Sequence, residues 1–253
     1  MARIPSVGGN WKMNTTRADA AELAAAVAGA GGAGCDVTVF PPFTLLTLVA
    51  EALADTDVRV GGQDVYFEPE GAFTGEISAG MLLDAGATAV LIGHSERRHV
   101  IGEDDGLIAR KLNAALEAGL AATLCVGETL EQREAGRTEA VNLGQLDAGL
   151  DAVPPAAFER LTIAYEPVWA IGKGRTASPA DAQAVHAAIR TRLAERYDEG
   201  LAQAIRLQYG GSVKPANAAE LFAQADIDGG LIGGASLEAE SFTAIVNAAR
   251  QSG

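Results

Sequence analysis

LTIAYEPVWAIGKGRTASPAD, residues 161–181, contains one complete junction between a strand, a loop and a helix. Leu161–Tyr165 is a short, largely apolar run, which is typical of a buried strand. Glu166 follows it directly, and Pro167 ends it. Ser178–Asp181 then supplies an N-cap serine, a proline at the first helical position and an acid three residues after the cap, so a helix begins there.

The carboxylate at the end of this strand stands directly before a bounded loop. Gly172 and Gly174 can act as hinges in that loop, and the bulky apolar segment Val168–Ile171 precedes them. This order indicates a catalytic base, Glu166, beneath a lid. An ordinary strand-to-helix connection is the other interpretation, and these residues alone leave it open.

The same unit recurs eight times along the chain. The predicted strands are Ile4–Gly8, Val37–Phe40, Val58–Gly61, Ala89–Ile92, Ala121–Val126, Leu161–Tyr165, Arg206–Tyr209 and Gly229–Ile232. The predicted helices are Arg17–Gly29, Thr44–Ala54, Ala79–Ala85, Gly106–Ala118, Thr138–Leu150, Pro179–Tyr197, Pro215–Gln224 and Leu237–Arg250. Nearly continuous apolar strands separated by helical crossovers are typical of a parallel sheet that is covered on both faces.

Eight such units in 253 residues predict an α/β fold, a single (β/α)8 barrel that spans residues 1–253. An open, doubly wound sheet is less well supported, because no Gly-x-Gly-x-x-Gly pattern follows the first strand. The chain also has no long Ser, Pro or Gly tract that would separate two domains.

Composition excludes several classes of function. The formal net charge of −14 argues against non-specific binding of nucleic acid, which needs basic patches. The chain has no signal-peptide core at its start and no apolar run long enough to cross a membrane. Its two cysteines, Cys35 and Cys125, cannot form a disulfide framework, so we expect a cytoplasmic protein.

In a barrel of this kind, the active site lies at the carboxyl ends of the strands. Lys12 follows the first strand and could hold an anion, although a solvated lysine is the alternative. His94 follows the fourth strand at the start of a predicted helix, where the dipole disfavours the imidazolium form. A structural histidine is the alternative there.

Two glycine pairs follow the last two strands. Gly210-Gly211 precedes Ser212, and Gly233-Gly234 precedes Ala235. Glycine pairs let backbone N–H groups close on an anion, and this position is the usual phosphate site of such barrels. We therefore expect a small phosphorylated substrate that faces Glu166.

These groups suit abstraction of a proton next to a carbonyl group. A carboxylate takes the carbon-bound proton, while a neutral imidazole stabilises the oxygen of the resulting enediolate. No cofactor motif is present, and the three histidines are not spaced as a metal site, so we expect neither a cofactor nor a metal. Glu103-Asp104-Asp105 is expected to complement the dipole of the helix that follows, and Glu128 to form a structural ion pair.

Six segments resemble the triosephosphate isomerase family, in that family's order and over nearly the whole chain. They are Asn10–Asn14, Gly71–Glu76, Gly93–Arg98, Tyr165–Gly172, Tyr209–Val213 and Gly233–Leu237. The resemblance implies interconversion of dihydroxyacetone phosphate and D-glyceraldehyde 3-phosphate, in glycolysis and gluconeogenesis.

The resemblance also implies roles for particular residues. It makes Glu166 the base, His94 the electrophile, Asn10 and Lys12 substrate contacts, and Glu96 a carboxylate beside the site. Gly172, Ser212, Gly233 and Gly234 would supply the backbone that holds the phosphate. It further implies a homodimer in which Thr74 reaches towards the partner's active site.

Two positions depart from the family's common pattern. Lys173 stands in the lid where threonine is common; we expect it to be solvated, with help in phosphate capture as the alternative. Asp64 stands where asparagine is common and would add a carboxylate at the expected subunit contact.

Two other classes of protein stay open at this point. Another phosphate-binding barrel enzyme, such as an epimerase or an indole-glycerol-phosphate-type lyase, should carry different groups after strands one, four and six. A non-catalytic scaffold should have lost Lys12, His94 or Glu166, and all three are present.

Overall fold

The computed structural model describes residues 3–32, 34–171 and 177–252. Its eight strands are all parallel to their neighbours and close into a barrel in chain order, with β1 paired to both β2 and β8. The strands are β1 (Ser6–Asn10), β2 (Asp36–Phe40), β3 (Val58–Gly62), β4 (Ala89–Ile92), β5 (Ala121–Val126), β6 (Leu161–Tyr165), β7 (Arg206–Tyr209) and β8 (Gly229–Ile232). The prediction of a (β/α)8 barrel is therefore confirmed.

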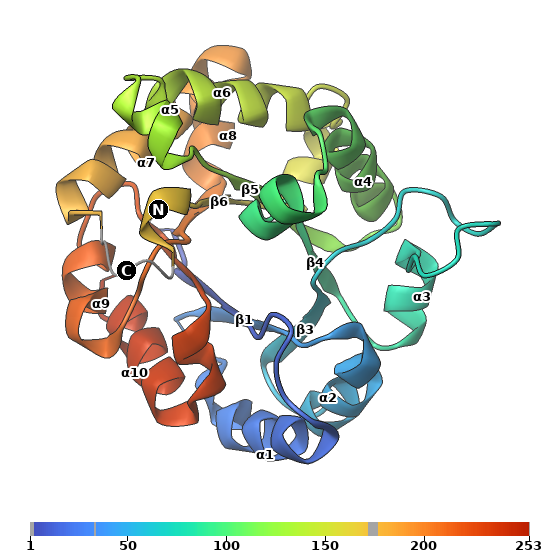
Figure 1. The fold of residues 1–253 in the computed structure, drawn as a ribbon. Helices are drawn as coiled ribbons and strands as arrows, with labels where there is room; N and C mark the ends of the chain where they lie inside the picture. The colour runs from blue at the N-terminus through green and yellow to red at the C-terminus, as the bar shows by residue number, and fades with distance from the viewer. Residues whose placement is uncertain (1–2, 33, 172–176, 253) are drawn as a thin grey trace.

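The α-helices form an outer ring around the strands (Figure 1). They are α1 (Arg17–Val27), α2 (Leu46–Leu53), α3 (Ala79–Asp84), α4 (Asp105–Glu117), α5 (Leu130–Glu134), α6 (Thr138–Gly149), α7 (Pro179–Arg196), α8 (Glu199–Ala204), α9 (Pro215–Phe222) and α10 (Ala239–Arg250). Short turns of other helix types are η1 (Ala28–Ala30), η2 (Phe43–Leu45), η3 (Arg97–Ile101), η4 (Pro155–Arg160), η5 (Val168–Ala170) and η6 (Gly234–Leu237). Among the described residues, no helix has the length and apolar character that a membrane crossing requires.

One predicted strand was displaced by two residues. The first strand was expected at Ile4–Gly8 but runs from Ser6 to Asn10. Pro5 has no N–H to donate, whereas the Ser6 N–H donates to the Asp228 carbonyl oxygen at 2.8 Å. Asn10, expected in the loop, is therefore the last residue of the strand and lies opposite Phe40 of β2.

Buried apolar side chains fill the inside of the barrel. A separate buried cluster there consists of Phe40, Ala89, Leu91, Cys125, Ala164 and Leu231. A Cβ atom at Gly8 would lie 2.9 Å from Leu231 Cδ1, so there is no room for a ligand at that level. Cys35 and Cys125 are both free and buried, in agreement with the prediction that no disulfide framework exists. A substrate site must lie at one end of the barrel.

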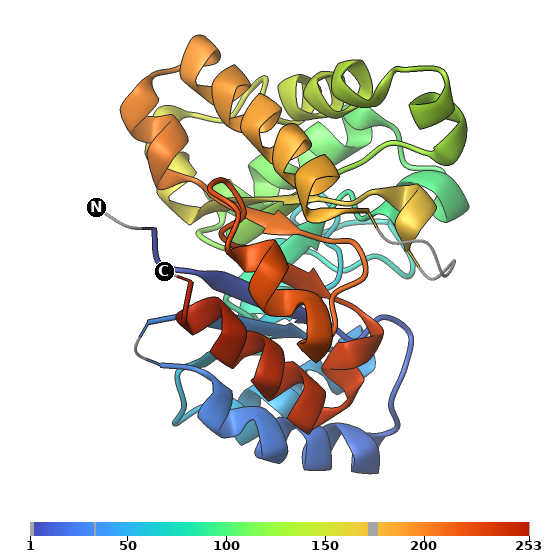
Figure 2. The ribbon, with the colours of Figure 1, turned by 90° about the vertical axis from the view of Figure 1, so that its left-hand side faces the viewer.

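Figure 2 shows which end each strand points to. The amino-terminal end of β1 lies at the same end of the barrel as the carboxyl end of α10, and η5 lies at the opposite end. Because the strands are parallel, all of their carboxyl ends meet at the end where η5 lies.

The acidic residues Glu103, Asp104 and Asp105, at the start of α4, have two different structural roles. Asp104 caps α4 by accepting the Leu107 N–H at 2.8 Å, and Asp105 lies in the first turn, as the dipole interpretation predicted. Glu103 instead turns inward. Its Oε1 lies 2.5 Å from Lys111 Nζ and 2.7 Å from Arg97 Nε, and its side chain is buried.

Asp64 belongs to the same buried ionic cluster. Lys111, only 1% exposed, binds both of its carboxylate oxygens, at 2.9 and 2.7 Å, and Arg97 Nε lies 3.0 Å from one of them. Burial raises the pKa of Asp64 to about 6, although Lys111 opposes the shift. Asp64 is 4% exposed within its own chain, where its carboxylate is held by Lys111 and Arg97, and its part in a subunit contact stays a prediction.

Candidate functional site

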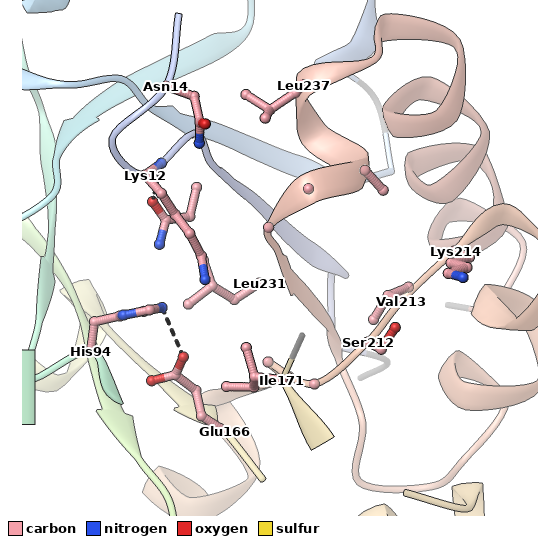
Figure 3. A pocket seen from close by; sticks show the side chains of 16 residues that line it. Lys12, Asn14, His94, Glu166, Ile171, Ser212, Val213, Lys214, Leu231 and Leu237 are labelled. Atoms are coloured by element: carbon pink, nitrogen blue, oxygen red, sulfur yellow. Dashed lines mark hydrogen bonds and ion pairs between the residues drawn. The ribbon is translucent and has the colours of Figure 1, made fainter. Parts of the chain in front are cut away.

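A pocket of about 300 Å³ opens at the carboxyl ends of the strands. Figure 3 shows its side chains gathered from opposite sides of the barrel. It is lined by Asn10, Lys12, Asn14, His94, Glu166, Ile171, Gly210, Gly211, Ser212, Val213, Lys214, Leu231, Gly233, Gly234, Ala235 and Leu237. The polar residues that we predicted from strand ends one, four, six, seven and eight therefore share one cavity.

Among the described candidate residues, two do not line this pocket. Glu96 lies beside it and contacts Lys12. Thr74 is exposed on the segment between β3 and α3, which extends away from the barrel (Figure 1). Gly172, together with the lid residue Lys173, lies outside the described residues.

Glu166 is fixed by the backbones of two neighbouring strands. Its N–H donates to the Val126 carbonyl oxygen at 2.8 Å, so the residue continues the pairing of β5 with β6. Glycines pack against it on both sides: a Cβ at Gly127 would lie 1.9 Å from the Glu166 carbonyl oxygen, and one at Gly210 would lie 2.8 Å from Glu166 Cγ. Any larger side chain at either position would displace the carboxylate.

The Glu166 carboxylate is 1% exposed and accepts hydrogen bonds from the segment after β4. Oε2 accepts the Ser95 N–H at 2.8 Å, and Oε1 lies 2.9 Å from His94 Nε2 and 3.3 Å from Ser95 Oγ. Burial alone would raise the pKa of Glu166, but His94, the Ser95 N–H and Lys12 together hold that pKa below its ordinary value.

His94 is 6% exposed, and the bonds to its two nitrogens differ. The Glu96 N–H points at Nδ1 from 3.3 Å, so Nδ1 acts as an acceptor and Nε2 carries the proton that faces Glu166. This is a neutral tautomer, ready to donate from Nε2.

The pKa of His94 differs from the sequence expectation. We expected the dipole of a following helix to disfavour the imidazolium form. Burial does lower the pKa, but Glu166 outweighs burial and raises the pKa of His94 above its ordinary value. The helix is also weaker than predicted, because a single π turn, η3, follows His94. The 2.9 Å approach of Glu166 joins residues 72 positions apart in the chain, and the local sequence pattern does not reveal it.

Lys12 adopts a strained backbone conformation, with φ at +52°. Left-handed geometry at a non-glycine residue costs about 1–3 kcal/mol, and it persists only where the surroundings hold it. Here Asn10 Oδ1 accepts the Lys12 N–H at 2.9 Å, and Gln63 Nε2 donates to the Lys12 carbonyl oxygen at 2.8 Å. The turn directs Nζ to Glu96 Oε1, 2.5 Å away, at the edge of the pocket.

Gly233 and Gly234, which follow β8, also line the pocket. η6 begins at Gly234, and Ser236 supports it by donating from Oγ to the Gly233 carbonyl oxygen at 2.7 Å. A Cβ at Gly233 would lie 3.4 Å from Lys12 Cε, so the lysine stem runs alongside this glycine. An anion seated here could reach both the backbone N–H groups and a cation.

Glu128, expected to form an ion pair, mainly accepts hydrogen bonds from neutral donors. Trp169 Nε1 donates to it at 2.8 Å, Asn142 Nδ2 at 2.9 Å and the Tyr165 hydroxyl at 3.1 Å. The Arg133 guanidinium is at 4.0 Å, so the expected ion pair is the longest of these contacts. The bond to Trp169 holds η5, which follows Glu166, against the end of β5.

Sequence reasoning missed Ser95 and Gly127 as residues that shape the site, and it assigned Gly210 to anion binding without its contact with Glu166. Ser95 supplies the N–H that holds Glu166, and Gly127 and Gly210 supply the space for it. For Ser95, the available signal was its position at a helix start directly after His94. Within the described part of the chain, no group of three His, Cys, Asp or Glu side chains is placed to hold a metal ion.

Comparison with known proteins connects this geometry with one family. A family model described as triosephosphate isomerase matches residues 5–249. The chain is 55% identical over 249 residues to a protein named triosephosphate isomerase from Alcanivorax borkumensis, covering 98% of this chain and 100% of that protein. It is 52% identical over 247 residues to one of the same name from Chloroflexus aurantiacus, covering 97% and 99%. A third, from Symbiobacterium thermophilum, is 50% identical over 251 residues, covering 98% of both chains.

The coupling of His94 to Glu166 predicts a change in titration. In Glu166→Gln, the pKa of His94 should fall below its ordinary value, because burial and Lys12 still oppose protonation while the carboxylate is gone. NMR titration of the imidazole signals measures this shift directly. His186, which is buried and whose pKa is lowered chiefly by that burial, is the internal control and should not move.

The same pKa shifts determine how the stability of the fold changes with pH. A raised His94 pKa stabilises the fold below the ordinary histidine value, and this contribution is lost as the pH rises through the folded pKa. A lowered Glu166 pKa stabilises the fold above the ordinary carboxyl value and is lost as the pH falls. A His94 pKa that is equal in wild type and Glu166→Gln would contradict the coupling.

Proposed function

The chain belongs to the triosephosphate isomerase family, and from that premise we propose that Glu166 and His94 interconvert dihydroxyacetone phosphate and D-glyceraldehyde 3-phosphate in this pocket. The reaction moves one proton between two adjacent carbons, so it needs a base, an electrophile and a hold on the phosphate. We further propose that it requires no cofactor and serves glycolysis and gluconeogenesis in the cytoplasm.

One observation carries this proposal more than any other. A buried carboxylate and an Nε2–H donor lie 2.9 Å apart in a pocket that Ser212 and the glycines after β7 and β8 also line. A carboxylate alone could perform many reactions. A carboxylate beside a neutral donor, facing an anion cradle, suits enolisation of a small phosphorylated carbonyl compound.

Substrate binding has to release Glu166 from its present partners. In this structure, the Glu166 carboxylate accepts hydrogen bonds from the Nε2–H of His94 and the N–H of Ser95. When the substrate's carbonyl oxygen takes the Nε2–H, Glu166 is free to turn towards the neighbouring carbon. Moving the carboxylate away also removes the main charge that raises the pKa of His94, which favours the neutral imidazole in the complex.

The proton steps then balance. Glu166 removes the proton from the carbon next to the carbonyl group, and the electron pair moves to form the carbon–carbon double bond of an enediolate. The Nε2–H of His94 donates to the developing oxygen anion, and the Lys12 ammonium stabilises its charge. His94 passes the Nε2 proton to this oxygen and takes the proton of the neighbouring hydroxyl group in return, so the charge moves to the other oxygen. Protonated Glu166 then returns its proton to the former carbonyl carbon, and the new carbonyl group forms on the neighbouring carbon, which yields the other isomer.

The phosphate is held at the end of the pocket away from Glu166. Ser212, Gly233 and Gly234 offer backbone there, and Lys12 passes beside Gly233. Asn10 supports the strained turn that aims Lys12, and Glu96 holds Nζ until the substrate arrives. We assign a further backbone contact to Gly172 from the family resemblance, as part of a lid that excludes water.

The proposed base is tested by Glu166→Gln. The substitution keeps the shape of the side chain but removes the proton acceptor, so kcat for isomerisation of D-glyceraldehyde 3-phosphate should fall about 10²- to 10⁴-fold with a smaller change in KM. Protein from a host without its own isomerase avoids background. Glu139→Gln, at the exposed start of α6, is the matched control and should retain wild-type activity. Full activity of Glu166→Gln would remove Glu166 as the base.

We also propose that the chain forms a homodimer through the segments that follow β1, β3 and β4. These segments expose large apolar side chains, which are rarely left in water without a purpose. The residues and their exposed fractions are Met13 (95%), Phe73 (40%), Met81 (55%), Val100 (78%) and Ile101 (64%). Thr74 stands next to Phe73 on the projecting segment, which suits insertion beside the partner's Lys12 turn.

The proposed homodimer predicts the mass of the protein in solution, and it predicts that substitution of Phe73 weakens association. Light scattering should give twice the chain mass of 25.9 kDa at micromolar concentration, with dissociation on dilution. Phe73→Asp should shift the protein towards the single-chain mass, because it places a charge on the buried side of the contact. A single-chain mass for the wild type at all concentrations would contradict the dimer.

A further inference from the structure

The segment between β3 and α3 is held in a defined shape by its own chain. We call residues 66–77 the arm; it projects from the barrel beside α3 (Figure 1). Its two ends are joined, because the Tyr66 N–H donates to the Ile77 carbonyl oxygen at 2.7 Å and Tyr66 pairs with Ser78 as an isolated parallel bridge. Near the tip, the Glu76 N–H donates to the Phe73 carbonyl oxygen at 3.0 Å.

Three aromatic rings stack along the arm. The centroid of the Tyr66 ring lies 4.8 Å from that of Phe73 and 4.3 Å from that of Phe67, with tilted planes in both pairs. At these distances, aromatic pairs contribute a stabilising interaction in addition to the stabilisation that comes from burying their surface. Tyr66 thus connects the tip of the arm to its base.

A cation from a different element covers the base of this stack. Arg110, an exposed residue of α4, places its guanidinium carbon 3.9 Å from the centroid of the Phe67 ring. At that distance a guanidinium is attracted by the face of the ring. The order from barrel to tip is therefore Arg110, Phe67, Tyr66 and Phe73.

From this chain of contacts we propose that Arg110 is a positioning residue for dimerisation: through Phe67 and Tyr66 it holds the arm in the shape that a second copy of this chain receives. The proposal rests on the proposed homodimer. An arm that is ordered before association loses less conformational freedom on binding, and affinity rises accordingly. Arg110 does not itself need to touch the partner.

Lys111, the neighbouring residue of α4, independently anchors the arm's root, the segment around Asp64 that precedes the arm. Lys111 is buried and binds Asp64, two residues before Tyr66. Replacing Arg110 should therefore loosen the arm while the barrel and the root stay in place. This separation allows the role of Arg110 to be measured without unfolding the protein.

The test is a double-mutant cycle on the dimer dissociation constant, measured by analytical ultracentrifugation across a dilution series. The variants are Arg110→Met, Phe67→Leu and the double variant, with Arg110→Lys to retain the charge. Arg137→Met, an exposed arginine at the start of α6, matches the change of charge at a distant place. Isomerase activity at protomer concentrations far above Kd reports that each barrel is intact.

Arg110→Met should raise Kd about 4- to 25-fold, since an exposed cation–π contact is equivalent to about 2- to 5-fold per arm and the dimer has two arms. Arg110→Lys should raise Kd less than Arg110→Met does, and Arg137→Met should have the wild-type Kd. In the Phe67→Leu background, Arg110→Met should have no further effect, because the ring through which it acts is gone.

Two results would overturn the role of Arg110. One is a Kd for Arg110→Met within twofold of wild type. The other is the same loss with and without Phe67, which would show that Arg110 acts elsewhere. A wild-type protein that stays a single chain at every concentration would instead remove the homodimer, and the role of Arg110 with it. That result is read from the wild type before any variant is made.

Discussion

The eight strands hydrogen-bond in one closed ring, from β1 round to β8 and back to β1, and every strand points the same way. Because the ring is closed, the register of each strand is fixed by neighbours on both sides. β6 shows the consequence: Tyr165 pairs with Val126 and with Tyr209, the Glu166 N–H continues the ladder to β5, and the Gly210 N–H donates to the Tyr165 carbonyl oxygen at 2.7 Å. Backbone hydrogen bonds therefore fix the position of Glu166, and side-chain contacts only add to this. Gly127 and Gly210 keep the space that it occupies.

An acidic chain with a formal net charge of −14 has to receive an anionic substrate, and local features accomplish this. Lys12 is turned inward by a strained backbone that Asn10 and Gln63 hold. Its charge is balanced by Glu96 until an anion competes for it. The glycines after β7 and β8 line the same pocket and are proposed to hold the phosphate through uncharged backbone. In the same way the Glu166 carboxylate accepts from His94 Nε2, so the proposed base, like Lys12, has a partner that a substrate can replace.

Patterns local in the sequence predicted most of the fold. β4 to β8 have the predicted bounds, since apolar runs bounded by Gly, Pro or a charge are unambiguous at that length. The short α5 and α8 were missed because a helix of five or six residues has too few turns to show a period. Within the site, strand ends located Lys12, His94, Glu166 and the glycine pairs. What the pattern could not give were contacts across the barrel: the 2.9 Å approach of Glu166 to His94, the turning of Glu103 towards Lys111, and the burial of Asp64.

The central claim is that backbone closure around Glu166 sets the position of the base, and Gly210→Ala tests it most directly. The added Cβ would lie 2.8 Å from Glu166 Cγ, so the carboxylate must shift while every catalytic group remains present. The account predicts that kcat for isomerisation falls about 10- to 100-fold with the fold intact, since a displacement of about 1 Å can cost that much. Gly144→Ala, on the exposed face of α6 with open space around its Cβ, should keep full activity. Wild-type kcat in Gly210→Ala would contradict the account.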